Sequence, residues 1–271
     1  MKKGLQDMDM SDNNTMEENN EMHDEKKVIK LLDSLYDKAL EGIPKISESV
    51  DEIVDDYMSK YDTPEEATKH LIRYQIAKCG TSGFLTGLGG LITLPIAVPA
   101  NITSVLYVQL RMVAAIAKIG GYDIRSDQVQ TLAYACLTGS AMTDILKGTG
   151  IKFGEKLAIT GIKRIPTAVL VKINQKVGFR FLTKFGEKGL VNIVKVVPVV
   201  GGVIGGGIDV GATKIIGSNA YRLFIKGEMP KKNKELVEID DDDVIVELDS
   251  KCADTDKDYS GDYEEKSVSN K

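Results

Sequence analysis

The feature that most constrains this chain is a run of 32 residues, from Cys79 to Leu110, without a charged side chain. Glycines and prolines interrupt its apolar side chains at Gly83, Gly87, Gly89, Gly90, Pro95 and Pro99. Exposing so much apolar surface to water is unfavourable, so this stretch must be buried. Either the rest of the protein or a lipid bilayer has to cover it.

The two prolines divide the stretch, because a proline inside a helix removes a backbone hydrogen bond and clashes with the preceding turn. We expect one helix over residues 82–94, a turn over residues 95–99 and a second helix over residues 100–119. Gly120 and Gly121 follow and end the second helix. The pattern therefore predicts a central apolar helical hairpin.

The length of the uncharged run limits how the hairpin can meet a membrane. One spanning helix needs about 20 residues, and two need about 40 plus a turn. The run permits one pass and is too short for two. Gln109 and Arg111 also fall on the second helix, where a charge at bilayer depth is costly. Two alternatives stay open: burial inside a helical bundle, or insertion into one leaflet.

Charge is strongly segregated along the chain. Residues 1–25 contain 8 acidic and 2 basic side chains, and residues 228–271 contain 15 acidic and 7 basic ones. The intervening residues 26–227 carry 17 acidic and 26 basic side chains, although the whole chain has a net charge of −5. We expect a single helical domain over residues 26–227 that is cationic, flanked by two disordered acidic tails.

The cysteines and histidines exclude several kinds of site. Cys79, Cys136 and Cys252 show no CxxC spacing, and His23 and His70 lie far apart. This usage is typical of a reduced cytosolic chain without a zinc site or a cofactor. Residues 1–14 carry no apolar segment behind their two lysines, so they do not predict a secretory signal.

Three helices are predicted before the uncharged stretch. Apolar residues at helical spacing from Val28 to Ala39 predict the first, which should end near Pro44. A second is predicted to begin near Ile46 and carry its apolar face through Tyr57. Thr63 begins a capping box with Pro64 at the first helical position, which predicts a third helix reaching about residue 78.

Residues 147–195 are strongly basic, with phenylalanines and aliphatic residues between the charges. They predict two or three amphipathic helices, broken near Gly161, Pro166 and Gly178. Such helices suit an anionic membrane surface, where each lysine contributes about 1 kcal/mol. The predicted membrane contacts are Lys163, Arg164, Lys172, Lys176, Arg180, Lys184 and Lys188. A solvated basic face without a ligand is the alternative.

A second apolar, glycine-dense segment covers residues 196–208 and is too short to span a bilayer. Gly201 and Gly205 lie four residues apart, which allows two helix backbones to approach closely. A final helix is predicted from about Asp209 to Ile225. With Gln109 and Arg111, Asp209 is one of three candidate functional polar residues within apolar surroundings.

These features resemble the EcsC family of bacterial proteins, named after a gene beside an ABC-transporter pair. The resemblance covers roughly residues 60–226 and rests on two blocks. The first block spans residues 82–123 and the second spans residues 197–224, with their glycines, prolines, Gln109-Leu110-Arg111-Met112, Gly121-Tyr122-Asp123 and Asp209 in the expected order. The resemblance implies an all-helical, membrane-associated protein and no established activity.

Common catalytic and nucleotide motifs are absent from the sequence. The glycine runs lack the Gly-Lys-Ser/Thr of a Walker loop and the spaced G-x-G-x-x-G of a dinucleotide loop. Serine hydrolase chemistry needs a positioned histidine, which neither His23 nor His70 provides. Nucleic acid is disfavoured because tryptophan and an RNA-binding aromatic signature are missing and the tails are acidic.

We therefore expect a non-enzymatic all-α protein, a glycine-rich helical bundle that associates with the inner face of the cytoplasmic membrane. Its predicted partner is the anionic lipid surface. Two alternatives stay open: an accessory subunit of a membrane complex such as an ABC transporter, and an enzyme acting on lipid or a small molecule. The sequence does not determine the oligomeric state.

Overall fold

The computed structural model of this chain describes residues 24–44, 46–80, 100–150, 159–185 and 203–230. These residues form helices joined by turns, and no strand occurs among them, apart from an isolated bridge between Ile43 and Ser47. The predicted all-α class is confirmed. The elements are a first helix over residues 24–41, α2 (Val50–Lys60), α3 (Pro64–Gly80), α5 (Ala100–Ile119), α6 (Asp127–Leu137), η1 (Gly139–Ala141), α7 (Met142–Lys147), α8 (Ile159–Lys163), α9 (Thr167–Phe185), α11 (Val203–Ala220) and the π-helical turn η2 (Tyr221–Ile225).

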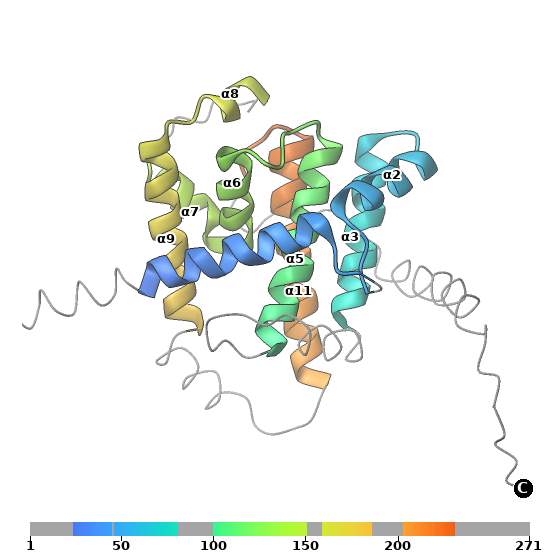
Figure 1. Cartoon of the computed structure of the whole chain (residues 1–271), viewed down its shortest axis with the longest axis horizontal. Helices are drawn as coiled ribbons and strands as arrows, with labels where there is room; N and C mark the ends of the chain where they lie inside the picture. Colours follow the sequence, from blue (N-terminus) through green and yellow to red (C-terminus); the bar gives the residue numbers. More distant parts are fainter. Residues whose placement is uncertain (1–23, 45, 81–99, 151–158, 186–202, 231–271) are drawn as a thin grey trace, which may run out of the picture.

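Two helices form the middle of the bundle. α5 packs against α11, and α3 contacts both of them. α6 lies on another side of α5 and carries α9 and α7 on its own outer side. Figure 1 shows the first helix, in dark blue, crossing the upright helices, with α9 at one edge of the molecule and α2 and α3 at the other.

Short-range sequence signals explain several helix ends, among them the predicted capping box at Thr63. Gly42 has a φ of +76° and ends the first helix. The Thr63 hydroxyl accepts a hydrogen bond from the backbone N–H of Glu66 at 3.2 Å and donates to its carboxylate at 3.1 Å. Ser126 similarly caps α6 by accepting from the N–H of Val129. These bonds satisfy backbone donors that the first turn of a helix leaves unpaired.

The start of α2 differs from the prediction. The helix begins at Val50, and Ile46 lies before it in the turn closed by the Ile43–Ser47 bridge, 36% exposed. Ser49 explains the difference, because its side chain and that of Glu52 form a complete capping box. The sequence contains this Ser-x-x-Glu pattern, which predicts the start of α2 more accurately than the apolar spacing from Ile46 does.

The basic segment also breaks at different places than predicted. The break near Pro166 is confirmed, since α8 ends at Lys163 and α9 begins at Thr167. The breaks near Gly161 and Gly178 are wrong, because both glycines lie inside helices. At Gly178 a Cβ atom would lie 3.1 Å from the backbone oxygen of Glu25, so the glycine lets the first helix cross α9 closely.

α11 begins earlier than predicted. It starts at Val203 and includes Asp209, which is therefore an interior helical residue and not the first one. Glycines do not stop a helix that packs along its length, since their cost of about 1 kcal/mol each is smaller than what packing can supply. After η2 the chain turns at Gly227, which has a φ of +65°.

The core surrounds α5. Every side chain from Leu106 to Ala117 is buried, including Gln109 and Arg111. Protein therefore covers residues 106–110, the last part of the uncharged stretch, and the helical residues that follow it. The predicted first arm of the hairpin, residues 82–94, the glycine segment up to residue 202 and both predicted tails beyond residues 24–230 lie outside the described residues.

Candidate functional site

Exposed positive charge recurs along one side of α9, which carries no acidic residue. Lys172, Lys176 and Arg180 are all exposed and recur every four residues, which places them on one side of the helix. A large apolar side chain accompanies them: Phe179 is 52% exposed and lies close to Lys172 and Lys176 around the helix. We call these four residues the basic face of α9.

The opposite side of α9 fixes the orientation of this face. Leu170, Ile173, Val177 and Phe181 are buried, at spacings of three and four residues. Burying such side chains stabilises a fold by about 1.5–3 kcal/mol each, so the helix cannot rotate without losing its packing. The basic face is therefore directed away from the core by the apolar pattern on its other side.

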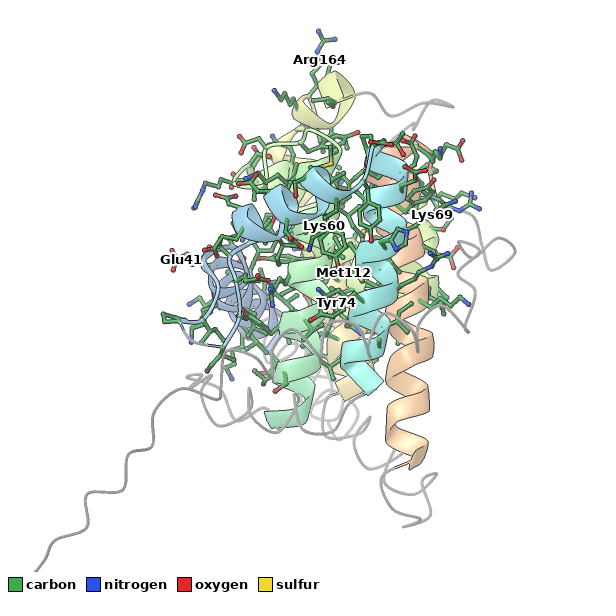
Figure 2. All side chains as sticks on the ribbon, turned by 90° about the vertical axis from the view of Figure 1, so that its right-hand side faces the viewer. Glu41, Lys60, Lys69, Tyr74, Met112 and Arg164 are labelled. Carbon is green, nitrogen blue, oxygen red and sulfur yellow. The ribbon has the colours of Figure 1, made fainter. Side chains whose placement is uncertain are left out.

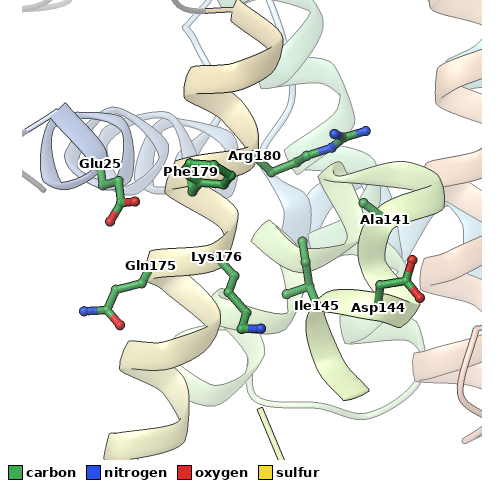
Figure 3. A pocket seen from close by; sticks show the side chains of 8 residues that line it. All are labelled: Glu25, Ala141, Asp144, Ile145, Gln175, Lys176, Phe179 and Arg180. Atoms are coloured by element: carbon green, nitrogen blue, oxygen red, sulfur yellow. The ribbon is translucent and has the colours of Figure 1, made fainter. Parts of the chain in front are cut away.

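A groove of about 470 Å³ lies beside the basic face. α9 contributes Gln175, Lys176, Phe179 and Arg180; α7 and the residue before it contribute Ala141, Asp144 and Ile145; the first helix contributes Glu25. In Figure 3, Lys176 and Arg180 extend toward the side of α7, whereas Glu25 lies on the other side of α9. Apolar and cationic side chains thus meet in one shallow depression.

Lys176 is also close to the end of α7. A Cβ atom added to Gly148, the C-cap of α7, would lie 2.5 Å from the Lys176 ammonium nitrogen. A cation is favourable at a helix C-terminus, where unpaired carbonyl groups concentrate negative charge. This contact holds the lysine at the edge of the groove while its side chain stays exposed.

The remaining predicted membrane contacts are only partly brought to this face. Lys163 and Arg164 are exposed at the end of α8, and Figure 2 shows Arg164 projecting from the end of the molecule. The side chains of Lys184 and Lys188 lie outside the described residues. The structure therefore joins three of the seven predicted cations into one face and places two others on a separate element.

The candidate polar residues of the core do not form one site. Gln109 donates a hydrogen bond from Nε2 to the hydroxyl oxygen of Thr213 at 3.1 Å, which ties α5 to α11. Arg111 lies on another side of α5, with its Nη2 3.6 Å from Oε2 of Glu48. The side chain of Asp209 is not among those described. Gln109 and Arg111 thus connect α5 to different neighbours.

Arg111 is the most deeply buried charge in the described chain, with 2% of its side chain exposed. Burial lowers the pKa of its guanidinium, and Tyr107 and Glu48 oppose this effect. Its Nε has no hydrogen-bond partner in the part of the chain that the structure describes. An arginine in this position stays protonated, so the charge is held in the interior at a cost in desolvation.

Sequence reasoning missed a half-buried polar cluster between the first helix and α6. Tyr134 donates a hydrogen bond to Asp33 at 2.7 Å, and Gln130 donates to the same carboxylate oxygen at 3.1 Å. Burial raises the pKa of Asp33; the bond from Tyr134 opposes the rise, and the nearby charges of Asp37 and Asp127 add to it. No sequence signal pairs residues about one hundred positions apart.

Other reactive groups are in structural positions. His70 stacks on Tyr61 with ring centroids 4.1 Å apart. Cys136 is fully buried, and burial raises the pKa of its thiol. Within the described residues, no group of three or more His, Cys, Asp or Glu side chains is arranged to hold a metal ion.

Comparisons with protein-family models, curated proteins and solved structures found no match to this chain. Among the helices that the structure describes, none is both long enough and apolar enough to cross a membrane.

Proposed function

We propose that this protein is a non-enzymatic, membrane-associated helical protein that binds anionic lipid surfaces through its basic amphipathic helices, chiefly the basic face of α9. The observation that carries the proposal is the exposure of Phe179 on the same side of α9 as Lys172 and Lys176, next to Arg180. A solvated basic face gains nothing from exposed phenylalanine. At a membrane, lysine and arginine meet lipid headgroups while apolar side chains enter the boundary below them.

The charge distribution of the surrounding chain supports this interpretation. Residues 159–185 contain six basic residues and no acidic one. Each cation near an anionic lipid surface contributes about 1 kcal/mol, so the three cations of the basic face together supply about 3 kcal/mol. That is a modest, reversible attraction, which suits peripheral association with the cytoplasmic side of a membrane.

The proposal includes the EcsC-type architecture that the sequence resembles. In this arrangement α5 is the second arm of the apolar hairpin, and residues 82–94 supply the first arm. The acidic tails are then extensions outside the helical domain that begin beyond the described residues: residues 24–25 belong to the first helix and Pro230 is buried, so the predicted tail boundaries at residues 25 and 228 are corrected. The burial of α5 from Leu106 onward supports a hairpin that is held mainly by protein on this arm.

Vesicle flotation tests the proposal. The full chain is mixed with vesicles of phosphatidylcholine alone or with 30% phosphatidylserine, at low and high salt. We expect flotation with the anionic vesicles only, and its loss at high salt because screening weakens exposed charges. The triple variant Lys172→Gln, Lys176→Gln, Arg180→Gln should bind at least roughly tenfold more weakly, since tenfold corresponds to about 1.4 kcal/mol.

A matched control removes the same charge elsewhere. Lys38, Lys60 and Lys69 lie on the first helix, α2 and α3, and Figure 2 shows Lys60 and Lys69 on the side that faces away from α9 in Figure 1. The triple glutamine variant at these three positions should bind within roughly threefold of the native chain, because charges away from the contact add little. Equal losses in both variants would show a nonspecific charge effect and overturn the assignment to α9.

A further inference from the structure

The basic face and its groove have a complementary sequence in the same chain. Residues 235–249 contain eight acidic residues and no basic one, with aliphatic residues between them. Four aspartates, Asp240 to Asp243, are followed directly by Val244, Ile245 and Val246. We call residues 235–249 the acidic segment. Its mixture of carboxylates and aliphatic side chains matches the mixture of cations and apolar surface on α9.

The described chain ends next to the groove. The hydroxyl of Thr143 donates a hydrogen bond to the backbone oxygen of Pro230 at 2.8 Å, and Pro230 is buried. The next two residues of α7, Asp144 and Ile145, line the groove. The chain at Pro230, which continues toward the acidic segment, is therefore held against α7. This short helix also forms one wall of the groove.

From these observations we propose that the acidic segment docks intramolecularly on the basic face of α9. The carboxylates of residues 240–243 pair with Lys172, Lys176 and Arg180, and the aliphatic residues that follow them cover Phe179 and Ile145 in the groove. The segment occupies the surface that the proposed function gives to anionic lipid. It acts as an internal competitor that lipid must displace.

The length of the connecting chain permits this contact. Nine residues lie between Pro230 and Asp240, which makes ten steps along the chain of about 3.3–3.6 Å each, so the reach is about 35 Å. The basic face from Lys172 to Arg180 extends over eight helical residues, or about 12 Å. The four aspartates can therefore reach every cation of the face.

Because the acidic segment is part of the same chain, even a weak contact is enough to keep it on the basic face most of the time. A segment linked through a short flexible connection has an effective concentration near its binding site of about 1 mM. A docking constant of about 0.1 mM would then keep the face about 90% occupied and weaken lipid binding roughly tenfold. A contact of this strength is readily displaced by a membrane that carries many anionic headgroups.

The acidic groups near the face do not prevent docking. Asp144 and Glu25 are the two carboxylates that line the groove. Figure 3 shows the carboxylate of Asp144 directed away from Lys176 and the Glu25 side chain on the far side of α9. The three cations of the face are spaced along the exposed side of the helix, so the acidic segment can meet them without crossing either carboxylate.

Carbodiimide cross-linking of the full-length chain tests the docking directly. The reagent joins a carboxylate to a lysine amine only when the two are in contact, and mass spectrometry locates the bond. We expect bonds from residues 240–243 to Lys172 and Lys176 at low salt, at several times the yield of bonds to Lys60 and Lys69. Equal yields at the two lysine pairs would overturn the proposal.

A mixture of ¹⁵N-labelled and unlabelled chains separates contacts within one chain from contacts between chains. Bonds within single chains support the proposal. Bonds found only between labelled and unlabelled chains would overturn it, because the occupant of the groove would then be a second copy.

The consequence for lipid is measured with a variant in which Asp240 to Asp243 are all asparagine. Circular dichroism and unfolding should match the native chain, because the four substitutions leave every buried residue of the described chain unchanged. We expect this variant to bind vesicles with 30% phosphatidylserine roughly tenfold more tightly than the native chain. Unchanged or weaker binding would overturn the competition.

The two proposals fail in different ways. This inference rests on the proposed function only for its consequence at the membrane. If the cross-links form but neither the native chain nor the asparagine variant binds vesicles, docking is supported and the lipid function fails. If vesicles bind and the cross-links are absent, the lipid function stands and docking is wrong.

Discussion

α5 and α9 are both helices of about five turns that carry apolar and positively charged side chains, yet they occupy opposite environments. α5 is covered on every side from Leu106 to Ala117, and its Arg111 is enclosed. α9 buries one side and leaves three cations and Phe179 exposed. The helix with the stronger membrane-like composition is therefore the one that protein covers, and the more charged helix offers the surface.

This difference shows that apolar content alone does not identify a membrane contact. A uniformly apolar helix is equally suited to the centre of a bundle, where neighbouring helices remove it from water. A helix that meets lipid from the aqueous side must keep both charge and some apolar surface exposed. Within the described residues, α9 meets this requirement, and the following predictions test the contrast.

The largest expected effect is the difference in stability loss between alanine substitutions at two phenylalanines on α9. Phe181 is 6% exposed and Phe179 is 52% exposed, two residues apart on the same helix. Phe181→Ala should lower the free energy of unfolding by about 3–5 kcal/mol, because it removes a buried ring and leaves a cavity. Phe179→Ala should change it by less than about 0.5 kcal/mol. Urea unfolding measures both, and equal losses would contradict the two-sided description of α9.

A second comparison concerns two arginines. Arg111→Ala should lower the free energy of unfolding by about 2–4 kcal/mol, since it empties a buried site. Arg180→Ala should change it by less than about 0.5 kcal/mol because the side chain is exposed.

The substitution Arg111→Met separates the charge of this residue from its volume. It keeps most of the volume while removing a desolvated charge, so its stability should lie within about 1 kcal/mol of the native chain or above it. A large loss in Arg111→Met, measured by the same unfolding experiment, would show that the charge itself holds the fold.

Replacing either of two helical glycines by alanine should change the free energy of unfolding by a smaller amount, and the two changes should have opposite signs. At Gly178 a Cβ would lie 3.1 Å from atoms of Glu25, whereas at Gly211 no described atom lies within 4 Å. Gly178→Ala should destabilise the chain by about 1–2 kcal/mol through overpacking. Gly211→Ala should stabilise it by about 0.5–1 kcal/mol, because alanine is the better helix former. Thermal unfolding distinguishes them, and stabilisation by Gly178→Ala would refute the close helix crossing.

The smallest expected effect is a pH dependence from Asp33. Its pKa is raised above 3.8 by burial, so the folded chain binds its proton more tightly than the unfolded chain does. The contribution of Asp33 to stability is therefore complete below pH 3.8 and decreases as the pH rises through the folded pKa. Because the carboxylate is half exposed, solvent limits this change to less than about 1 kcal/mol.

The variant Asp33→Asn isolates this titration, because it keeps an acceptor for Tyr134 and removes the ionisable group. Relative to the variant, the native chain should lose stability as the pH rises from 3 to 7, on the order of a few tenths of a kcal/mol. A stability difference that stays constant over this range, or changes in the other direction, would contradict the raised pKa. Urea unfolding at a series of pH values provides the measurement.

Local signals made much of the helical framework predictable. The capping box at Thr63, the cap at Ser126 and the glycine at position 42 all have the roles that their sequence context indicates. The second arm of the predicted hairpin matches α5, from Ala100 to Ile119. A cap depends on hydrogen bonds between residues only three or four positions apart, so the sequence nearby contains all the information it needs.

Tertiary packing decided the features that no local pattern contains. α9 continues through Gly178 because a glycine there permits contact with Glu25, more than one hundred and fifty positions away in the sequence. The same packing separated Arg111, enclosed beside α2, from Arg180, which is exposed. Residue type and periodicity gave both arginines as candidates. Which of them meets water depends on the neighbours that folding brings from distant parts of the chain, since burial is a property of the assembled bundle.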